Sequence, residues 1–182
     1  MEKTIRVTIE GIQPLLMHRF PLEEGGTAPK GYDKWEKERQ AEFAAYRDPE
    51  TRELRMQSEA IRQAMISAAK WTKGKGRASL KTEVAATVLI TPIWCGLGVT
   101  EYVIDTRSIV NQNTKGRVLC HRPRFDSWSL NFTIKYDPLL LKASDLEEIL
   151  TNAGSRVGIG PFRPAKSGYF GRWKVVAFDP EK

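Results

Sequence analysis

The sequence has few of the residues from which disulfides, zinc sites and histidine-based catalytic sites are made. Its 182 residues include two cysteines and two histidines. Cys95 and Cys120 lie in apolar sequence, without CxxC spacing and without a nearby cluster of histidines. This context favours reduced, structural thiols over a disulfide or a zinc ion. We therefore expect no metal site.

Long hydrophobic runs are also missing. No apolar run approaches the roughly 18 residues that span a membrane, and the first residues, MEKTIRVTIEG, lack the apolar segment of a signal peptide. The hydrophobic fraction of 41% and the charged fraction of 28% are ordinary for a globular protein. We expect a single domain over residues 1–182 that is cytoplasmic and has no membrane partner.

The known phosphate-binding motifs are absent too. Residues 157–173 read VGIGPFRPAKSGYFGRW, in which Gly158 and Gly160 form a G-x-G, but Arg163 stands where GxGxxG needs its third glycine. There is no G-K-[ST] for a P-loop. The glycines also follow an expected helix, whose C-terminal end is partly negative, whereas a dinucleotide loop opens a helix. We expect no nucleotide cofactor.

Acidic residues are missing from three segments, although the net charge of the chain is only +7. Residues 70–81, 106–124 and 156–174 hold 15 of the 29 basic residues, which leaves 14 basic against 22 acidic residues elsewhere. Cations gathered among glycines and aromatic residues suit a groove for a nucleic-acid backbone. The alternative is a set of solvated loops that are basic by chance.

Apolar residues that alternate with polar ones predict strands at 4–12 and 128–136. Apolar runs predict two more strands, at 84–94 and 172–178. On the second alternating strand one face carries Trp128, Leu130, Phe132, Ile134 and Tyr136.

Two helices complete the predicted core. One covers residues 59–71 with Ser58 as its N-cap, and the other begins with a capping box of Ser144 and Glu147 and is closed by Gly154. The order of elements is strand, helix, strand, strand, helix, strand. The predicted fold class is therefore α+β, with a ferredoxin-like βαββαβ core like that of the RNA-recognition motif.

Two additions interrupt this core. Residues 21–57 form an insertion after the first strand, with a loop and a short helix at 32–47 that has Trp35 and Phe43 on one side. Residues 100–126 read as a β-hairpin arm, because two strands flank a polar tip at 111–116.

The glycine-rich stretch at 157–173 is longer and more basic than a plain turn requires. Arg163, Lys166 and Arg172 could neutralise phosphates, and glycines would let a bound strand approach the main chain. Its aromatic side chains could stack on bases or pack beneath the loop: Phe162, Tyr169 and Phe170.

The stretch RVGIGPFRPAKSGYFGRWKV, placed after the second helix and before the last strand, resembles the signature glycine-rich loop of the RAMP superfamily of CRISPR-associated proteins. GIQPLLMHRF and AIRQAMISAAK also look like parts of the superfamily's backbone subunits, the Cas seven type. The resemblance implies that several copies line up along a guide RNA and hold it by its phosphates. The arm at 100–126 is similar in position and composition to the thumb that interrupts the bound strand in that family.

We expect a protein that binds single-stranded RNA or DNA without regard to sequence. Copies of the protein would assemble head-to-tail into a filament or a multi-copy backbone, and the insertion could dock on a neighbouring copy. The protein could act alone, as a reduced relative carried by a phage or mobile element, or together with other CRISPR or phage proteins. The candidate nucleic-acid-binding residues are His18, Arg19, Lys70, Lys73, Lys75, Arg77, Arg107, Lys115, Arg117, Arg122, Arg124, Gly158, Gly160, Arg163, Lys166 and Arg172.

Two other functions remain open from the sequence. RAMP relatives that process CRISPR RNA use a histidine as general acid or base, which makes His18 the candidate for a metal-independent endoribonuclease. An aspartate of the insertion could act in target cleavage, although the acids there are not spaced as metal ligands. These acids are Glu23, Glu24, Asp33 and Asp48.

The other alternative is a protein-only mimic or inhibitor of a CRISPR backbone.

Overall fold

Four antiparallel strands form the main sheet of the protein. They are β1 (Lys3–Gly11), β4 (Leu89–Thr91), β8 (Ser129–Tyr136) and β9 (Trp173–Pro180), in the spatial order β4-β8-β1-β9. The structure is a computed structural model that describes residues 2–19, 25, 29–74, 78–110 and 114–181. The first and third core strands lie side by side at the centre of the sheet, as in the ferredoxin-like plan, so the predicted fold class is confirmed.

The alternating patterns of β1 and β8 bury one side of the sheet. Ile5, Val7 and Ile9 of β1 are buried, and each pairs with a residue of β8 that is also buried. All five residues predicted for the inner face of the second alternating strand, from Trp128 to Tyr136, are buried as well. Period-two alternation therefore decides which side of this sheet faces the core.

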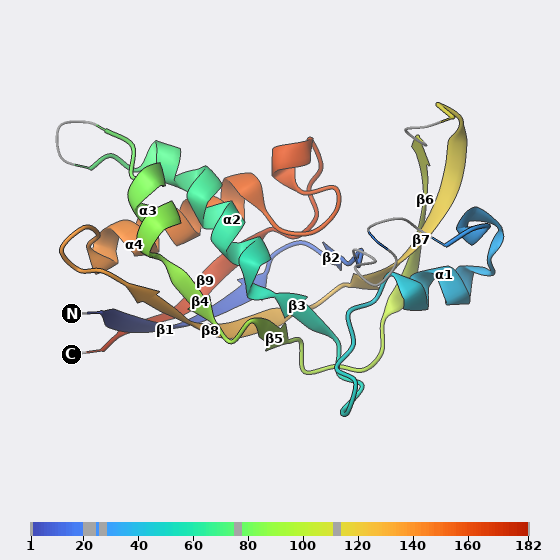
Figure 1. Ribbon diagram of the computed structural model, residues 1–182, viewed down its shortest axis with the longest axis horizontal. Helices are drawn as coiled ribbons and strands as arrows, with labels where there is room; N and C mark the ends of the chain where they lie inside the picture. The colour runs from blue at the N-terminus through green and yellow to red at the C-terminus, as the bar shows by residue number, and fades with distance from the viewer. Residues whose placement is uncertain (1, 20–24, 26–28, 75–77, 111–113, 182) are drawn as a thin grey trace.

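Three helices cover that inner side: α2 (Ser58–Ala68), α3 (Lys81–Thr87) and α4 (Ala143–Asn152) (Figure 1). The helices pack through their apolar stripes, which include Ile61 and Met65 of α2 and Leu146 and Ile149 of α4, all buried. The result is a two-layer α+β core with one open sheet face. None of the helices in the described part of the chain is long and apolar enough to cross a membrane.

The start of each core helix differs from the prediction. Gln57 is the N-cap of α2, while Ser58 is its first helical residue and donates its hydroxyl to the Ile90 carbonyl at 3.3 Å. At the start of α4 the Asp145 carboxylate accepts the Lys142 backbone N–H at 3.4 Å, in place of the predicted capping box. In α2 the Ser58 hydroxyl bonds to a neighbouring strand and not to its own helix, and in α4 Asp145 takes the place of the predicted Glu147.

The end of α4 also differs. The chain does not stop at Gly154 but continues through a π-helical turn, η5 (Ala153–Val157), and ends at Gly158 with φ 69°. A Cβ on Gly154 would collide with the main-chain carbonyl of Trp173. This glycine therefore allows the helix to pass close to β9, and Gly158 supplies the left-handed turn.

The predicted strand at 84–94 is wrong over its first half. Residues 81–87 form α3, the strand β4 is short, and β5 (Trp94–Gly96) pairs instead with β3 (Arg55–Gln57). Alanine favours helix, and Arg62 of α2 donates to the carbonyls of Ala85 and Val88 at 2.5 and 2.8 Å, which holds the end of α3. Pro92, which follows β4, has no N–H with which to continue the ladder between β4 and β8.

The arm is the strand pair β6 (Val103–Val110) and β7 (Arg117–Phe125), joined at its base by β2 (Leu15–Leu16) in the order β2-β7-β6. It projects from the end of the core opposite to both termini (Figure 1). The predicted hairpin is confirmed, and residues 111–113 of its tip lie outside the described residues.

Cys95 and Cys120 are both buried, and burial raises the pKa of Cys95 to about 11.

The predicted insertion helix is present as a 3-10 turn, η2 (Tyr32–Lys34), followed by α1 (Lys37–Phe43). Trp35 and Phe43 do lie on one side, with ring centres 5.6 Å apart. Helix α1 packs against the arm, mainly on β7. The later part of the insertion enters the core, where Leu54 and Met56 are buried.

Glu42 of α1 ties the insertion to the base of the arm. Its carboxylate accepts hydrogen bonds from Arg47 at 2.6 and 2.9 Å, from Arg52 at 2.8 Å and from the Tyr102 hydroxyl at 3.0 Å, just before β6. The hydrogen bonds from Arg47 are the main reason that the pKa of Glu42 is lowered. The ionised form of Glu42 is therefore favoured in the folded protein.

We predict that Glu42→Gln lowers the free energy of unfolding at pH 7 by about 1 kcal/mol, because three donors lose a charged acceptor at a partly exposed site. The wild type should lose this contribution as the pH falls below the ordinary value of 4.5 and through the lowered pKa. Urea unfolding from pH 7 to pH 3 measures both effects. Glu50→Gln, at an exposed site, is the control; equal losses in the two variants would contradict the prediction.

Candidate nucleic-acid interface

Two of the three acid-free segments meet where the arm lies against the glycine-rich loop. The guanidinium carbon of Arg107, on β6, is 4.5 Å from the ring centre of Phe170 and 5.6 Å from that of Phe162. The guanidinium of Arg122, on β7, is also 5.6 Å from the Phe162 ring. Cations of both arm strands therefore pack on aromatic rings of the loop.

Phe162 holds an unusual main-chain conformation at this contact. Its φ is 53°, in the left-handed region that bulky residues rarely adopt. The Phe170 N–H donates to the Phe162 carbonyl at 3.1 Å and closes this part of the loop. The loop is therefore shaped around the two rings that face the arm.

Asp105 is a site residue that sequence reasoning missed. Its carboxylate is only 6% exposed, accepts hydrogen bonds from Arg107 at 2.7 and 3.1 Å, and lies 3.6 Å from Arg124. The acid-free segment begins one residue later, so the charge count stopped short of it. A signal was available, since residues 105 and 107 are two apart on a strand and share a face.

This acid changes which cations are free to bind a ligand. Arg107 and Arg124 are paired with Asp105, and Arg124 also pairs with Asp126 at 2.8 Å. Three exposed candidates near the arm tip and on the loop form no ion pair among the described residues: Lys115, Arg117 and Lys166. These three are therefore available for phosphate contacts.

Arg122 and Arg172 are less accessible than predicted. Arg122 is 9% exposed, and its Nε is buried without a hydrogen-bond partner in the part of the chain that the structure describes. The Nε of Arg172 is also buried without a partner among the described residues, although the residue as a whole is half-buried. A buried guanidinium such as that of Arg122 acts on a ligand mainly through its field.

His18 and Arg19 lie where β7, the end of α1 and the chain after β2 meet. The Met17 N–H donates to Pro123 at 2.9 Å and the Arg19 N–H to Ala44 at 2.8 Å, while the Arg19 side chain lies 5.7 Å from a ring of α1. Desolvation and then the charge of Arg122 lower the pKa of His18 to about 4. The His18 side chain is exposed, which weakens the first cause, but the second acts in the same direction. The imidazole is therefore neutral at pH 7.

The third acid-free segment lies elsewhere. Lys70 and Lys73 follow α2, at the end of the core away from the arm (Figure 1). The Lys70 ammonium lies 4.4 Å and the Arg156 guanidinium 4.9 Å from the ring centre of Trp71. The described part of this segment therefore meets residues 156–174 at their start. Two further candidates lie outside the described residues: Lys75 and Arg77.

The glycines of the loop give space to the protein's own backbone. The Gly158 N–H donates to the Ala153 carbonyl at 2.9 Å. Gly160 has φ 75°, and a Cβ there would collide with the Leu16 carbonyl. Arg163 donates to the Gly160 carbonyl at 3.1 Å, which fixes its position over the loop. These contacts seat the loop against the chain that follows β1.

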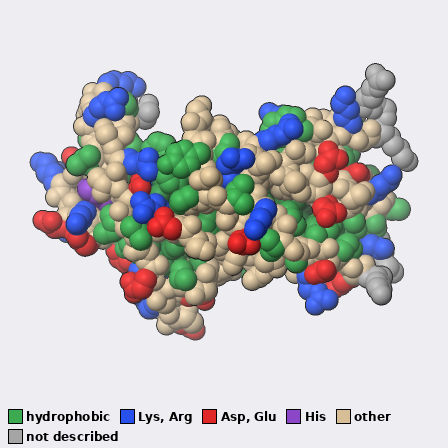
Figure 2. Space-filling model, turned by 180° about the vertical axis from the view of Figure 1, so that it is seen from behind, with side chains coloured by type: hydrophobic (Ala, Val, Ile, Leu, Met, Phe, Trp, Pro, Cys, Tyr) green, Lys and Arg blue, Asp and Glu red, His purple; other side chains and the backbone are tan. Residues whose placement is uncertain are grey.

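The open face of the main sheet differs from the stacking surface of an RNA-recognition motif. Its centre carries Arg6, Thr8, Asn131 and Thr133, and the Thr8 hydroxyl donates to Asn131 at 2.7 Å. No aromatic ring lies on this face among the described residues, whereas RNA-recognition motifs stack bases on sheet aromatics. Figure 2 shows basic side chains at the tip of the arm, and basic and acidic ones interspersed over the rest of that view.

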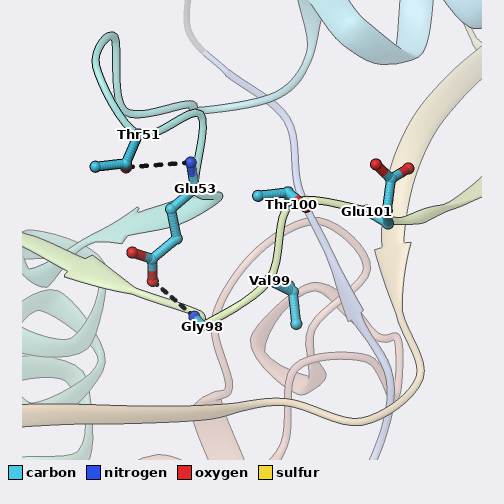
Figure 3. Close-up of a pocket in the computed structure, with 6 residues that line it drawn as sticks. All are labelled: Thr51, Glu53, Gly98, Val99, Thr100 and Glu101. Atoms are coloured by element: carbon cyan, nitrogen blue, oxygen red, sulfur yellow. Dashed lines mark hydrogen bonds between the residues drawn. The ribbon is translucent and has the colours of Figure 1, made fainter.

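A hollow of about 570 Å³ lies between the turn at 51–53 and residues 98–101 (Figure 3). The Glu53 carboxylate accepts the Gly98 N–H at 2.7 Å and points away from Glu101. With two acids and no cation in its lining, the hollow is unsuited to a polyanion. No cluster of His, Cys, Asp and Glu suited to a metal ion occurs in the described ranges.

No protein-family model matches the sequence, and no curated protein matches it. The fold is similar to that of a chain in a cryo-EM structure of the Type III-B Cmr-beta complex bound to cognate target RNA, with a TM-score of 0.53 and 12% sequence identity. The match covers all of this chain and 61% of the other, so this chain spans about three-fifths of that chain's length. The likeness shows that the two chains share a fold.

We predict that Asp105→Asn lowers the free energy of unfolding by about 2 kcal/mol, because Arg107 and Arg124 lose a buried charged acceptor. Asp126→Asn is the control, since Asp126 pairs with Arg124 and no other described cation, and its side chain is 57% exposed. Urea unfolding at pH 7 measures both variants. A loss for Asp126→Asn as large as that for Asp105→Asn would show that the buried carboxylate is not special.

Proposed function

We propose that the protein binds single-stranded nucleic acid through the surface formed by the arm and the glycine-rich loop, by its phosphates and without regard to sequence. The observation that carries this proposal is the contact of Arg107 with Phe170, which joins two acid-free segments into one surface. Lys115 and Arg117, near the tip of the arm, and Lys166, on the loop, add exposed cations that form no ion pair with any described residue. Such a surface neutralises a backbone without contacting base edges.

The structural neighbour supports RNA as the ligand. That protein is part of a Type III-B Cmr-beta complex bound to cognate target RNA. We extend this to the present chain as RNA binding in a CRISPR-like setting, with single-stranded DNA as the alternative ligand.

We further propose that several copies assemble head-to-tail along the strand, since a heterologous interface that does not close produces an open array. Helix α1 packs on the arm of its own chain, which leaves only its outer, charged side for a neighbour. Lys37 and Glu38 lie on that outer side and are exposed.

The proposal assigns no catalytic step. Desolvation and the charge of Arg122 lower the pKa of His18, so its imidazole would be a weak general acid at neutral pH, and we assign it a contact with the bound strand. Incubation of labelled RNA with wild type and His18→Ala in EDTA tests this part. Cleavage that the substitution abolishes would support the endoribonuclease instead.

We predict that binding to a short single-stranded RNA weakens steeply with salt, and that replacing Lys115, Arg117 and Lys166 together by alanine reduces the slope of log K against log salt by about 2. Each lost phosphate contact removes about 0.7 from the slope on a single strand. Fluorescence anisotropy at salt concentrations from roughly 50 to 300 mM, over which phosphate contacts weaken, measures this slope.

The matched control also removes three charges. It replaces Lys3, Lys81 and Lys142, exposed lysines at the start of β1, at the start of α3 and before α4, away from the arm (Figure 1). It should leave the slope unchanged. Equal effects of the two sets would mean that net charge, and not this surface, drives binding. A wild type that binds no oligonucleotide would favour the protein-only mimic.

A further inference from the structure

The three aromatic residues of the glycine-rich loop have different environments. Phe170 is 3% exposed and belongs to the core, and Phe162 is half-buried under two arginines of the arm. Tyr169 is 55% exposed. Of the two uses that the sequence left open for these rings, packing beneath the loop accounts for both phenylalanines but not for the tyrosine.

The ring of Tyr169 is held in a fixed plane. It stacks on Phe170 with ring centres 4.4 Å apart and an interplanar angle of 24°, and Phe170 is itself contacted by Arg107 at 4.5 Å. The Tyr169 hydroxyl is also one of the lesser causes, after Asp105, of the raised pKa of Arg107. Since Phe170 covers one face of the tyrosine, the large exposed fraction includes the other face.

We propose that the free face of Tyr169 is a stacking platform for one base of the bound strand. This inference rests on the proposed function, and it adds a base contact to a surface otherwise assigned to phosphates. Stacking on an aromatic ring tolerates every base, so it agrees with binding that ignores sequence. A ring already held by Phe170 loses little conformational entropy when a base covers it.

The surroundings favour a nucleic-acid base over a protein side chain. Lys166, three residues before Tyr169, is exposed and unpaired among the described residues, and Arg163 is anchored on the same loop. The segment from 156 to 174 contains no acid. A phosphate held by these cations would place its nucleotide beside the ring, whereas an apolar partner would have to desolvate them.

The test uses a short RNA that carries 2-aminopurine, and the same RNA with abasic positions. We expect Tyr169→Ala to bind the intact RNA about ten-fold more weakly, as loss of one base stack predicts, with an unchanged salt slope and weaker quenching of 2-aminopurine. Abasic substitution should weaken the wild type by a similar factor and leave the alanine variant unaffected.

Tyr169→Phe is the control, because it keeps the ring and removes only the hydroxyl that reaches Arg107; it should bind like the wild type. Unfolding curves check that each variant is folded. Salt-dependent binding that Tyr169→Ala leaves intact, with the same abasic penalty as the wild type, would overturn the platform while preserving the proposed function. A wild type that binds no RNA at any salt concentration would overturn both.

Discussion

The contact between Arg107 and the glycine-rich loop depends on a buried acid. Asp105 holds the guanidinium by two hydrogen bonds, and the guanidinium in turn lies over Phe170, on which the ring of Tyr169 stacks. An exposed arginine would lose much side-chain entropy in such a position, and the carboxylate reduces that cost by fixing it in advance. A two-stranded arm would be marginal alone, and this contact adds to the attachments that β2 and α1 provide.

The rest of the fold places the loop where the arm can reach it. Gly154 lets the end of α4 pass close to Trp173, Gly158 turns the chain, and Gly160 admits the Leu16 carbonyl. Each glycine is used for contact between segments of this chain. This packing places the cations of the loop next to the arm. The candidate interface therefore depends on tertiary structure more than on any local motif.

The elements best predicted from the sequence were those with a clear period. Alternation decided β1 and β8, and the two acid-free segments that meet at the arm were recognised from charge alone. The strand predicted at residues 84–87 is wrong. The alanines there could belong to a helix or a strand, and Arg62, which is far away in sequence, holds them in a helix. Asp105 and the free face of Tyr169 could not be found by counting, since burial and stacking depend on contacts between separate segments. The site assignments of single arginines remain predictions.

The central claim is that the arm and the loop form one nucleic-acid surface while the open sheet face does not. Hydrogen–deuterium exchange with and without a single-stranded RNA tests it most directly. The account predicts that RNA slows exchange in β6, β7 and residues 158–172 together, and leaves the centres of β1 and β8 unchanged. Protection confined to β1 and β8, as in an RNA-recognition motif that binds on its sheet, would contradict it.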